Sequence, residues 1–168
     1  MSSSDASEPP VHQWLYECVG ILHHDLSIGN IMFRRLEGKV YGVLNDFDLS
    51  STVDSMAQAL SSNESTGTRP FMSPDLLTPL WTGGHLPRHD LESLFSIIIC
   101  LACRYEELHG LKPSAEPRAY ADWFNGSDQQ VFAQKMAFLV TLPNLPVQPH
   151  FADFTRWLTD LRGCLVGG

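Results

Sequence analysis

Two short segments carry acids and amides at spacings that suit metal chemistry. Asp25 and Asn30 stand five residues apart on a loop that leads into an apolar strand, and Asp46 follows a second strand ending at Leu44. The two strands are expected to form a hairpin, which brings Asn30 and Asp46 toward the same end. Carboxylate and amide oxygens are ligands that Mg²⁺ favours, and the ion keeps several waters. Asn30 and Asp46 could therefore share a metal ion, but this spacing alone is a weak signal, because an Asp and an Asn also suit an ordinary turn.

Two further motifs follow along the chain. The segment Gly67-Thr68-Arg69-Pro70-Phe71-Met72-Ser73-Pro74-Asp75 joins a Gly-Thr pair to a Ser-Pro-Asp, and Arg88-His89-Asp90-Leu91 opens an apolar helix. Asp90 alone would also serve as a simple helix-capping residue. Each motif by itself is weak, but four in this order, with a hairpin, a loop and a buried helix between them, form a strong signal.

These motifs are similar to those of protein kinases, whose catalytic loop reads H-R-D-L-x-x-x-N. The stretches HHDLSIGNIM, GVLNDFDLS, STGTRPFMSPDLL and RHDLESLF closely resemble the fungal-type protein kinase family. The resemblance covers about residues 14–104 and fades toward the C-terminus. It implies a kinase-like fold, ATP and Mg²⁺ as cofactors, and transfer of the ATP γ-phosphate to Ser or Thr of a protein whose identity the sequence does not indicate.

The resemblance also implies roles for residues of the catalytic loop and the hairpin. Asp25 would orient and deprotonate the substrate hydroxyl, while Asn30 and Asp46 would hold Mg²⁺. Asp46 and Ser27 would lie at the nucleotide. Thr68 would help to hold Asp25 and would shape the platform for the substrate hydroxyl.

Three more residues are implied as structural support for this site. His23 opens the catalytic loop. Asp75 takes the place of the glutamate that closes the activation segment and pairs with a late arginine, for which Arg156 and Arg162 are the candidates. Asp90 would accept backbone N–H bonds from the catalytic loop and lock that loop in place.

The sequence departs from the general kinase pattern at three positions of the site. His24 replaces the arginine that reads activation-loop phosphates, Ser27 replaces the lysine that supports the γ-phosphate, and Asp48 replaces the glycine of Asp-Phe-Gly. A histidine is mostly neutral at cytosolic pH, so we expect no charge switch at His24. The fungal-type family tolerates Ser27 and Asp48, so these two residues do not argue for inactivity.

A larger departure lies in the residues that precede the catalytic loop. The 22 residues before His23 contain one glycine, Gly20, and no lysine. They supply neither a Gly-rich phosphate loop nor the lysine that holds the α- and β-phosphates. We therefore expect a kinase C-terminal lobe without its N-terminal lobe, with a surface that a partner can cover. Because positioning and electrostatics supply nearly all of phosphoryl-transfer catalysis, this chain alone is expected to be inactive.

The elements that position the site make a mainly α (α+β) fold with a small β-hairpin at the catalytic loop. Residues 1–10 are expected to be a disordered tail and 11–165 the kinase-like lobe. Pro87 introduces an almost wholly apolar helix over about 89–104, which should lie at the centre. Before this helix, we expect a helix end over 11–19, a strand at 21–22, two strands at 31–34 and 40–44, and a mobile loop over 49–70. After it, we expect a connection over 105–118 and a helix that begins with a capping box of Ser127 and Gln130 and ends at about Val140. A last helix over about 151–163 is expected to carry an apolar stripe of Phe151, Phe154, Trp157, Leu158 and Leu161.

Composition limits the class of protein. The 168 residues are 43% hydrophobic and carry a net charge of −8, which indicates a globular domain and argues against nucleic acid as a partner. We expect no signal peptide and no membrane span, and hence an intracellular protein, cytoplasmic or nuclear. Cys100 and Cys103 lie in an apolar run and are expected to be buried thiols rather than metal ligands or redox residues.

Three functions compete at this point. The first is a protein Ser/Thr kinase. The second is a catalytically inactive kinase fragment that acts as a binding or decoy module. The third is a small-molecule phosphotransferase of the aminoglycoside or choline type. Enzymes of that third type share the H-x-D-x-x-x-x-N loop and the following Asp, but they lack the Gly-Thr…Ser-Pro-Asp segment, so we rank this function below the other two.

Overall fold

The computed structural model describes residues 17, 20–52, 67–107, 112–115, 118–141 and 144–167. The fold is mainly α-helical with small antiparallel strand pairs, which confirms the predicted class. The predicted tail and, apart from Glu17, the predicted helix over 11–19 lie outside the described residues. The described elements are β1 (Ile21–Leu22), η2 (Ile28–Asn30), β2 (Ile31–Leu36), β3 (Lys39–Leu44), β4 (Ser51–Thr52), η3 (Pro74–Leu77), α3 (Pro87–Arg104), β5 (Tyr105–Glu107), β6 (Lys112–Pro113), α4 (Asp122–Asn125), α5 (Asp128–Val140), η4 (Pro149–Phe154) and α6 (Thr155–Gly167).

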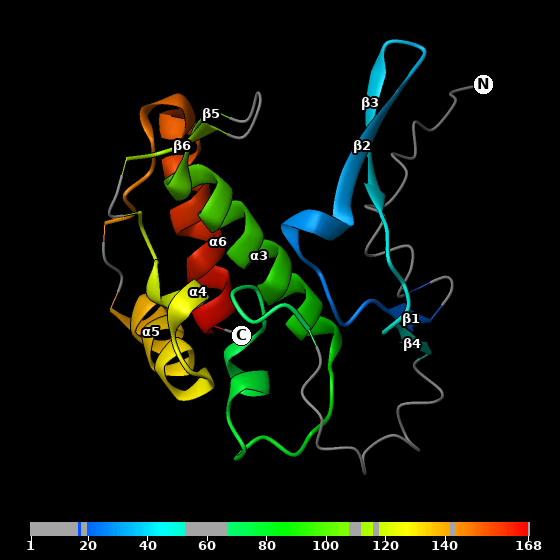
Figure 1. The fold of residues 1–168 in the computed structure, drawn as a ribbon, viewed down its shortest axis with the longest axis vertical. Coiled ribbons are helices and arrows are strands. Elements are labelled where there is room, and N and C mark those ends of the chain that lie inside the picture. The colour runs from blue at the N-terminus through cyan, green and yellow to red at the C-terminus, as the bar shows by residue number, and fades with distance from the viewer. Residues whose placement is uncertain are drawn as a thin grey trace, which may run out of the picture.

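Helix α3 supplies the centre of the helical body (Figure 1). Pro87 stands at the start of the helix, where its missing N–H costs nothing. Ten residues of α3 are buried, and the six apolar ones among them share one core cluster with side chains of α4, α5 and α6. Cys100 and Cys103 are free thiols in this core, as predicted, and burial raises the pKa of each to about 12. The central position predicted for this helix is therefore confirmed.

The β2–β3 hairpin extends away from the helical body (Figure 1). Its register runs from Ile31 opposite Leu44 to Leu36 opposite Lys39. The turn residues Glu37 and Gly38 both have positive φ, as the tight turns of two-residue hairpins require. The strands are longer than predicted, and most of their residues are exposed.

Helix α5 begins with the predicted capping box. The Ser127 amide donates to Gln130 Oε1 at 2.8 Å, and Ser127 Oγ accepts from the Gln130 amide at 3.4 Å. These reciprocal bonds satisfy two backbone donors at the helix start. The helix ends at Val140, where the sequence predicts its end.

The C-terminal prediction is wrong in part. The residues over 149–154 form the 3₁₀ helix η4, and the α-helix begins only at Thr155. Phe151 and Leu158 are buried, but Phe154 and Trp157 are 54% and 49% exposed. A 3₁₀ helix turns once every three residues, so a stripe drawn for one continuous α-helix does not stay on one face.

Two short strand pairs were not anticipated. Ser51 and Thr52 pair with β1, so the predicted loop over 49–70 contains a two-residue strand near its start, while residues 53–66 lie outside the described part. Strands β5 and β6 pair within the predicted connection over 105–118. Among the described residues, no helix has the length and hydropathy needed to cross a membrane.

Candidate active site

The carboxylate of Asp25 is held by Thr68 from a distant segment and lies near Asn30 of its own loop. The Thr68 amide and the Thr68 hydroxyl both donate to Asp25 Oδ1, each at 2.7 Å. Asn30 Nδ2 donates to the backbone carbonyl of Asp25 at 2.9 Å and lies 3.4 Å from Asp25 Oδ2. Charge-assisted bonds of this kind fix a carboxylate strongly. The structure thus brings Asp25, Asn30 and Thr68 together, as the sequence indicated.

Gly67 allows this approach of residues 67–75, which the resemblance to kinases identifies as the end of the activation segment. Its φ is +132°, a conformation that side chains rarely adopt. A Cβ at this position would lie 3.1 Å from the His24 carbonyl oxygen and 3.3 Å from Met72 Cγ. A glycine is therefore required for Thr68 to reach Asp25.

Asn30 and Asp46 lie at the same end of the hairpin. The Asn45 amide donates to the Asn30 carbonyl at 2.9 Å, and Asp46 follows Asn45 directly, two residues beyond the last paired position at Leu44. Asp46 has a positive φ of +61°, an uncommon conformation outside glycine that concentrates at functional sites. Its side chain is exposed, and no described residue bonds to its carboxylate.

The side-chain oxygens of Asn30 and Asp46 suit a metal ion that is shared with substrate phosphates, but not a metal ion that is bound by protein groups alone. No group of three or more His, Cys, Asp or Glu side chains among the described residues is arranged to hold a metal ion. Asn30 uses its Nδ2 toward Asp25, so its Oδ1 is not engaged in that bond, and the exposed Asp46 lies at the same end of the hairpin. Two such oxygens suit a Mg²⁺ ion that keeps waters and is bound jointly by substrate phosphates. They do not form a protein-only cage.

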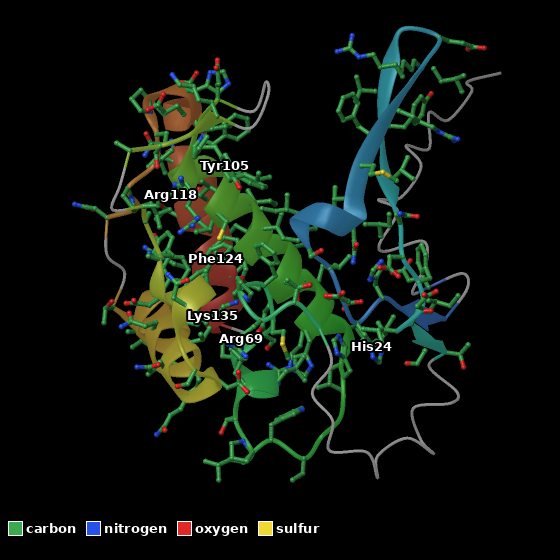
Figure 2. All side chains as sticks on the ribbon, viewed as in Figure 1. His24, Arg69, Tyr105, Arg118, Phe124 and Lys135 are labelled. Carbon is green, nitrogen blue, oxygen red and sulfur yellow. The ribbon has the colours of Figure 1, made fainter. Side chains whose placement is uncertain are left out.

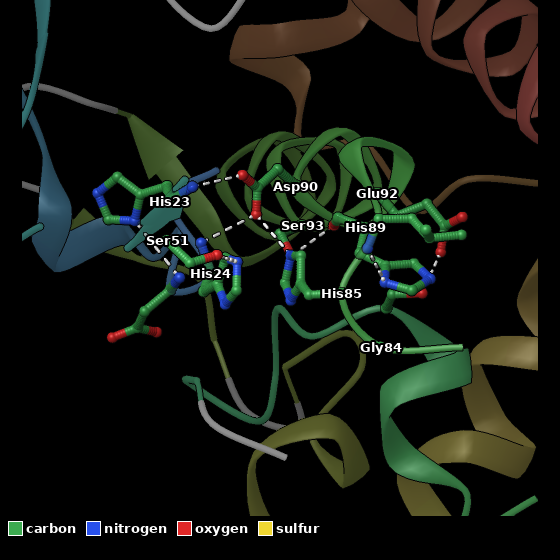
Figure 3. Close-up of polar contacts among 12 residues, drawn as sticks. His23, His24, Ser51, Gly84, His85, His89, Asp90, Glu92 and Ser93 are labelled. Carbon is green, nitrogen blue, oxygen red and sulfur yellow. Dashed lines mark hydrogen bonds and ion pairs between the residues drawn. The ribbon is translucent and has the colours of Figure 1, made fainter. Parts of the chain in front are cut away.

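Asp90 anchors the catalytic loop from the start of α3 (Figure 3). Its Oδ2 accepts from the His23 amide at 2.8 Å, and its Oδ1 accepts from the His24 amide at 3.2 Å and lies 2.9 Å from His85 Nε2. Burial alone would raise the pKa of Asp90, but the His85 bond and the two backbone N–H bonds outweigh burial and lower that pKa. The carboxylate is therefore ionised. The backbone bonds expected of Asp90 are present.

His23 links the catalytic loop to the hairpin end. Its Nε2 lies 2.9 Å from the Asn45 carbonyl oxygen, and its Nδ1 accepts from the Asp25 amide at 3.4 Å. A carbonyl only accepts, so Nε2 carries the proton. The ring also packs against Phe47, with centroids 4.8 Å apart. His23 therefore fixes both Asp25 and the backbone just before Asp46.

His24 occupies the place of the kinase arginine without its charge. Burial and then the neighbouring His85 lower the pKa of His24 to about 4, so the ring is neutral at pH 7. Its Nε2 lies 2.8 Å from Ser51 Oγ on β4. The position therefore provides a neutral hydrogen bond between the catalytic loop and β4, as Figure 3 shows.

The predicted partners of Asp75 are wrong. Asp75 bonds to Arg88, and His89 Nε2 lies 3.4 Å from Asp75 Oδ2 without hydrogen-bond geometry. Arg156 is exposed and lies 4.0 Å from Asp160, while the Arg162 guanidinium lies over the Phe138 ring. The ion pair that closes the activation segment thus comes from the start of α3.

Ser27 is not brought to the open part of the site. Ser27 is only 6% exposed and lies at the N-cap position of the 3₁₀ helix η2. Direct contact with a nucleotide would require the loop to move. We therefore leave Ser27 out of the proposed nucleotide site.

Sequence reasoning missed two residues that fix the activation segment (Figure 2). Arg69 Nε lies 2.7 Å from Asp128 Oδ1, and its Nη1 donates to the Gly126 carbonyl at 3.0 Å. Lys135 is buried on α5 and donates to the Met72 carbonyl at 2.6 Å. No spacing in the sequence indicates these contacts, because both join residues about sixty positions apart.

Comparison with known proteins agrees with the geometry. The family described as fungal protein kinase matches residues 10–102, more than half of the chain. The matched region contains Asp25, Asn30, Asp46, Thr68 and Asp90, and so the whole site. A search of curated proteins finds no match.

Proposed function

Because the chain belongs to the fungal protein kinase family, we propose that its site transfers the γ-phosphate of ATP to Ser or Thr hydroxyls of proteins. The observation that supports this proposal most strongly is the pair of 2.7 Å hydrogen bonds that Thr68 donates to Asp25 Oδ1. They fix the carboxylate, and among the described residues the one side-chain contact of Oδ2 is with Asn30 Nδ2 at 3.4 Å. Oδ2 is therefore the atom that would receive the proton of a substrate hydroxyl, since a general base must lie within hydrogen-bond reach of that proton.

Asn30 and Asp46 would hold Mg²⁺ in this proposal. When bound between these two residues, Mg²⁺ would supply positive charge that offsets the negative charge developing during transfer. The side chains contribute one amide oxygen and one carboxylate, and phosphates and waters would complete the shell. Support for this comes from the position of both residues at one end of the hairpin.

The chain's lysines do not serve the phosphates. Lys39 lies at the exposed tip of the hairpin, Lys112 pairs with Glu106, and Lys135 is buried against Met72. We propose that a second protein surface, either an N-terminal lobe or a partner, supplies the missing phosphate contacts. Until it is present, binding of Mg²⁺-ATP is weak and transfer does not proceed, because positioning supplies most of the catalysis.

A second candidate function, a non-catalytic binding module, is favoured by one specific observation. The hairpin exposes several large apolar side chains, with Phe33 68% and Val40 63% exposed. Exposed apolar patches mark interaction surfaces. The two functions differ in one respect that can be measured, since only the kinase site needs to bind a metal–nucleotide complex.

Paramagnetic NMR locates that complex. We expect substoichiometric Mn²⁺-ATP to broaden first the Asn30 side-chain NH₂ signals and the amides of Asp46 and Phe47, because Mn²⁺ accepts the oxygen ligands that suit Mg²⁺. Mn²⁺ without ATP is the control for adventitious binding to this acidic chain. Broadening centred on Asp122 and Asp128 of the α4–α5 region, or none at the hairpin end, would count against the kinase site and for the binding module.

A further inference from the structure

Asp90 shares its carboxylate between the catalytic loop and a third histidine. Besides the His23 and His24 amides, Asp90 Oδ1 lies 2.9 Å from His85 Nε2. The side chains are 9% exposed for His85 and 1% for Asp90, so water competes little for this contact. Because an ionised carboxylate only accepts, the proton of His85 must sit on Nε2.

Besides the Asp90 bond and an edge-on ring contact with His89 at 5.2 Å, His85 contacts the residue directly before Asp25. The His85 and His24 rings stack with centroids 4.0 Å apart and an interplanar angle of 5° (Figure 3). His24 is held on its far side by Ser51 at 2.8 Å. His85 therefore touches both the carboxylate that anchors the loop and the side chain that the loop carries.

The loop before α3 is itself built to present His85. Trp81 Nε1 donates to the Gly84 carbonyl at 2.7 Å, and Gly84 has a positive φ of +69°. On the other side, the Leu86 amide donates to His89 Nδ1 at 3.0 Å. His85 is thus fixed from both directions in the chain, between the activation segment and α3.

We propose that His85 is a positioning residue for the catalytic loop: its Nε2–H bond to Asp90 and its stack on His24 hold the His23-His24 backbone and so fix the carboxylate of Asp25. The coupling runs from His85 through Asp90 to the His23 and His24 amides, and Asp25 follows directly in the chain. Its importance for phosphate transfer rests on the proposed function. The structural coupling does not, and it can be measured without any nucleotide.

Three variants of the full chain distinguish the effect of the His85–Asp90 hydrogen bond from the effect of the volume of the His85 ring. His85→Gln keeps an amide donor near the place of Nε2, whereas His85→Leu keeps bulk and removes the donor. His150→Gln, at an exposed histidine of η4, is the matched control. The readouts are hydrogen exchange of the His23 and His24 amides, referenced to the Lys135 amide in α5, and the ring ¹⁵N spectrum of His85.

We expect His85→Leu to speed exchange of the two loop amides about tenfold or more relative to the reference, because their shared acceptor loses its partner. His85→Gln is expected to stay within about threefold of wild type, and His150→Gln to be unchanged. The wild-type ring spectrum should show the Nε2–H tautomer.

The proposal fails if His85→Leu leaves both amides as protected as in wild type, or if His85→Gln is as damaging as His85→Leu. It fails equally if neutral His85 carries its proton on Nδ1, a result that needs no variant to fold. If the wild-type chain does not bind Mg²⁺-ATP, the proposed kinase function is contradicted but the proposed role of His85 is not, since none of these readouts depends on nucleotide.

Discussion

Replacing Asp90 by alanine is expected to lower the free energy of unfolding by about 3 kcal/mol or more. The substitution leaves the buried His23 amide, the part-buried His24 amide and His85 Nε2 without the carboxylate that they share. Each buried polar group that loses its partner costs about 1–3 kcal/mol. Urea unfolding at pH 7 measures the effect as a lower midpoint with an unchanged m-value.

Two companions sharpen this test. Asp90→Asn keeps one acceptor oxygen and is expected to lose roughly half as much. Asp153→Ala removes an exposed acid of η4 and should change stability by less than about 0.5 kcal/mol. A loss below about 1 kcal/mol in Asp90→Ala would show that the catalytic loop does not depend on this anchor.

The second large effect concerns Lys135 and the pH. Lys135 is 2% exposed, with Nζ 2.6 Å from the Met72 carbonyl oxygen, 3.0 Å from Ser96 Oγ and 4.7 Å from the Trp123 ring centroid. Burial lowers the pKa of Lys135 to about 7. Between this pKa and the unfolded value of 10.5, the unfolded chain binds more protons than the folded chain. Stability therefore rises with pH above 7 and is lowest below it.

We expect the free energy of unfolding to increase by about 1–2 kcal/mol between pH 7 and pH 8.5, with the polar contacts of Nζ moderating the change. Lys135→Met should flatten this rise, whereas Lys112→Met, at a side chain 61% exposed, should leave it intact. The range ends at pH 8.5 because Cys100 and Cys103, whose pKa values burial raises, begin to lower stability above about pH 9. A flat wild-type profile, or an equal rise in Lys135→Met, would overturn this expectation.

Sequence patterns predicted correctly those secondary-structure elements whose formation depends on residues close together in the chain. The apolar run of α3, the Ser127–Gln130 box and the hairpin strands each depend on residues close in sequence, and all three are present. The 3₁₀ turn over 149–154 was missed because the apolar spacing around Phe151 and Phe154 also fits an α-helix. Pro149 at its start was compatible with either form.

The site shows the same division. The order of the motifs was enough to predict that Asp25 and Thr68 lie together and that Asp90 accepts hydrogen bonds from the backbone amides of the catalytic loop. It could not choose the partner of Asp75, because Arg88, Arg156 and Arg162 carry the same charge and only packing decides between them. Nor could it find His85, whose role depends on a stack with His24 across sixty-one residues. Contacts of that range are set by the tertiary arrangement and leave no periodic signal.

The most direct test of the kinase assignment is thermal unfolding of the 168-residue chain with and without millimolar Mg²⁺-ATP, because a ligand that binds the folded state raises the midpoint. The account predicts a cooperative transition that rises by about 2 °C or more. The rise should vanish with EDTA and in Asp46→Ala, and it should persist in Asp153→Ala. A cooperative transition that ignores the nucleotide would contradict the account, and would identify a folded domain of kinase ancestry that binds no ATP.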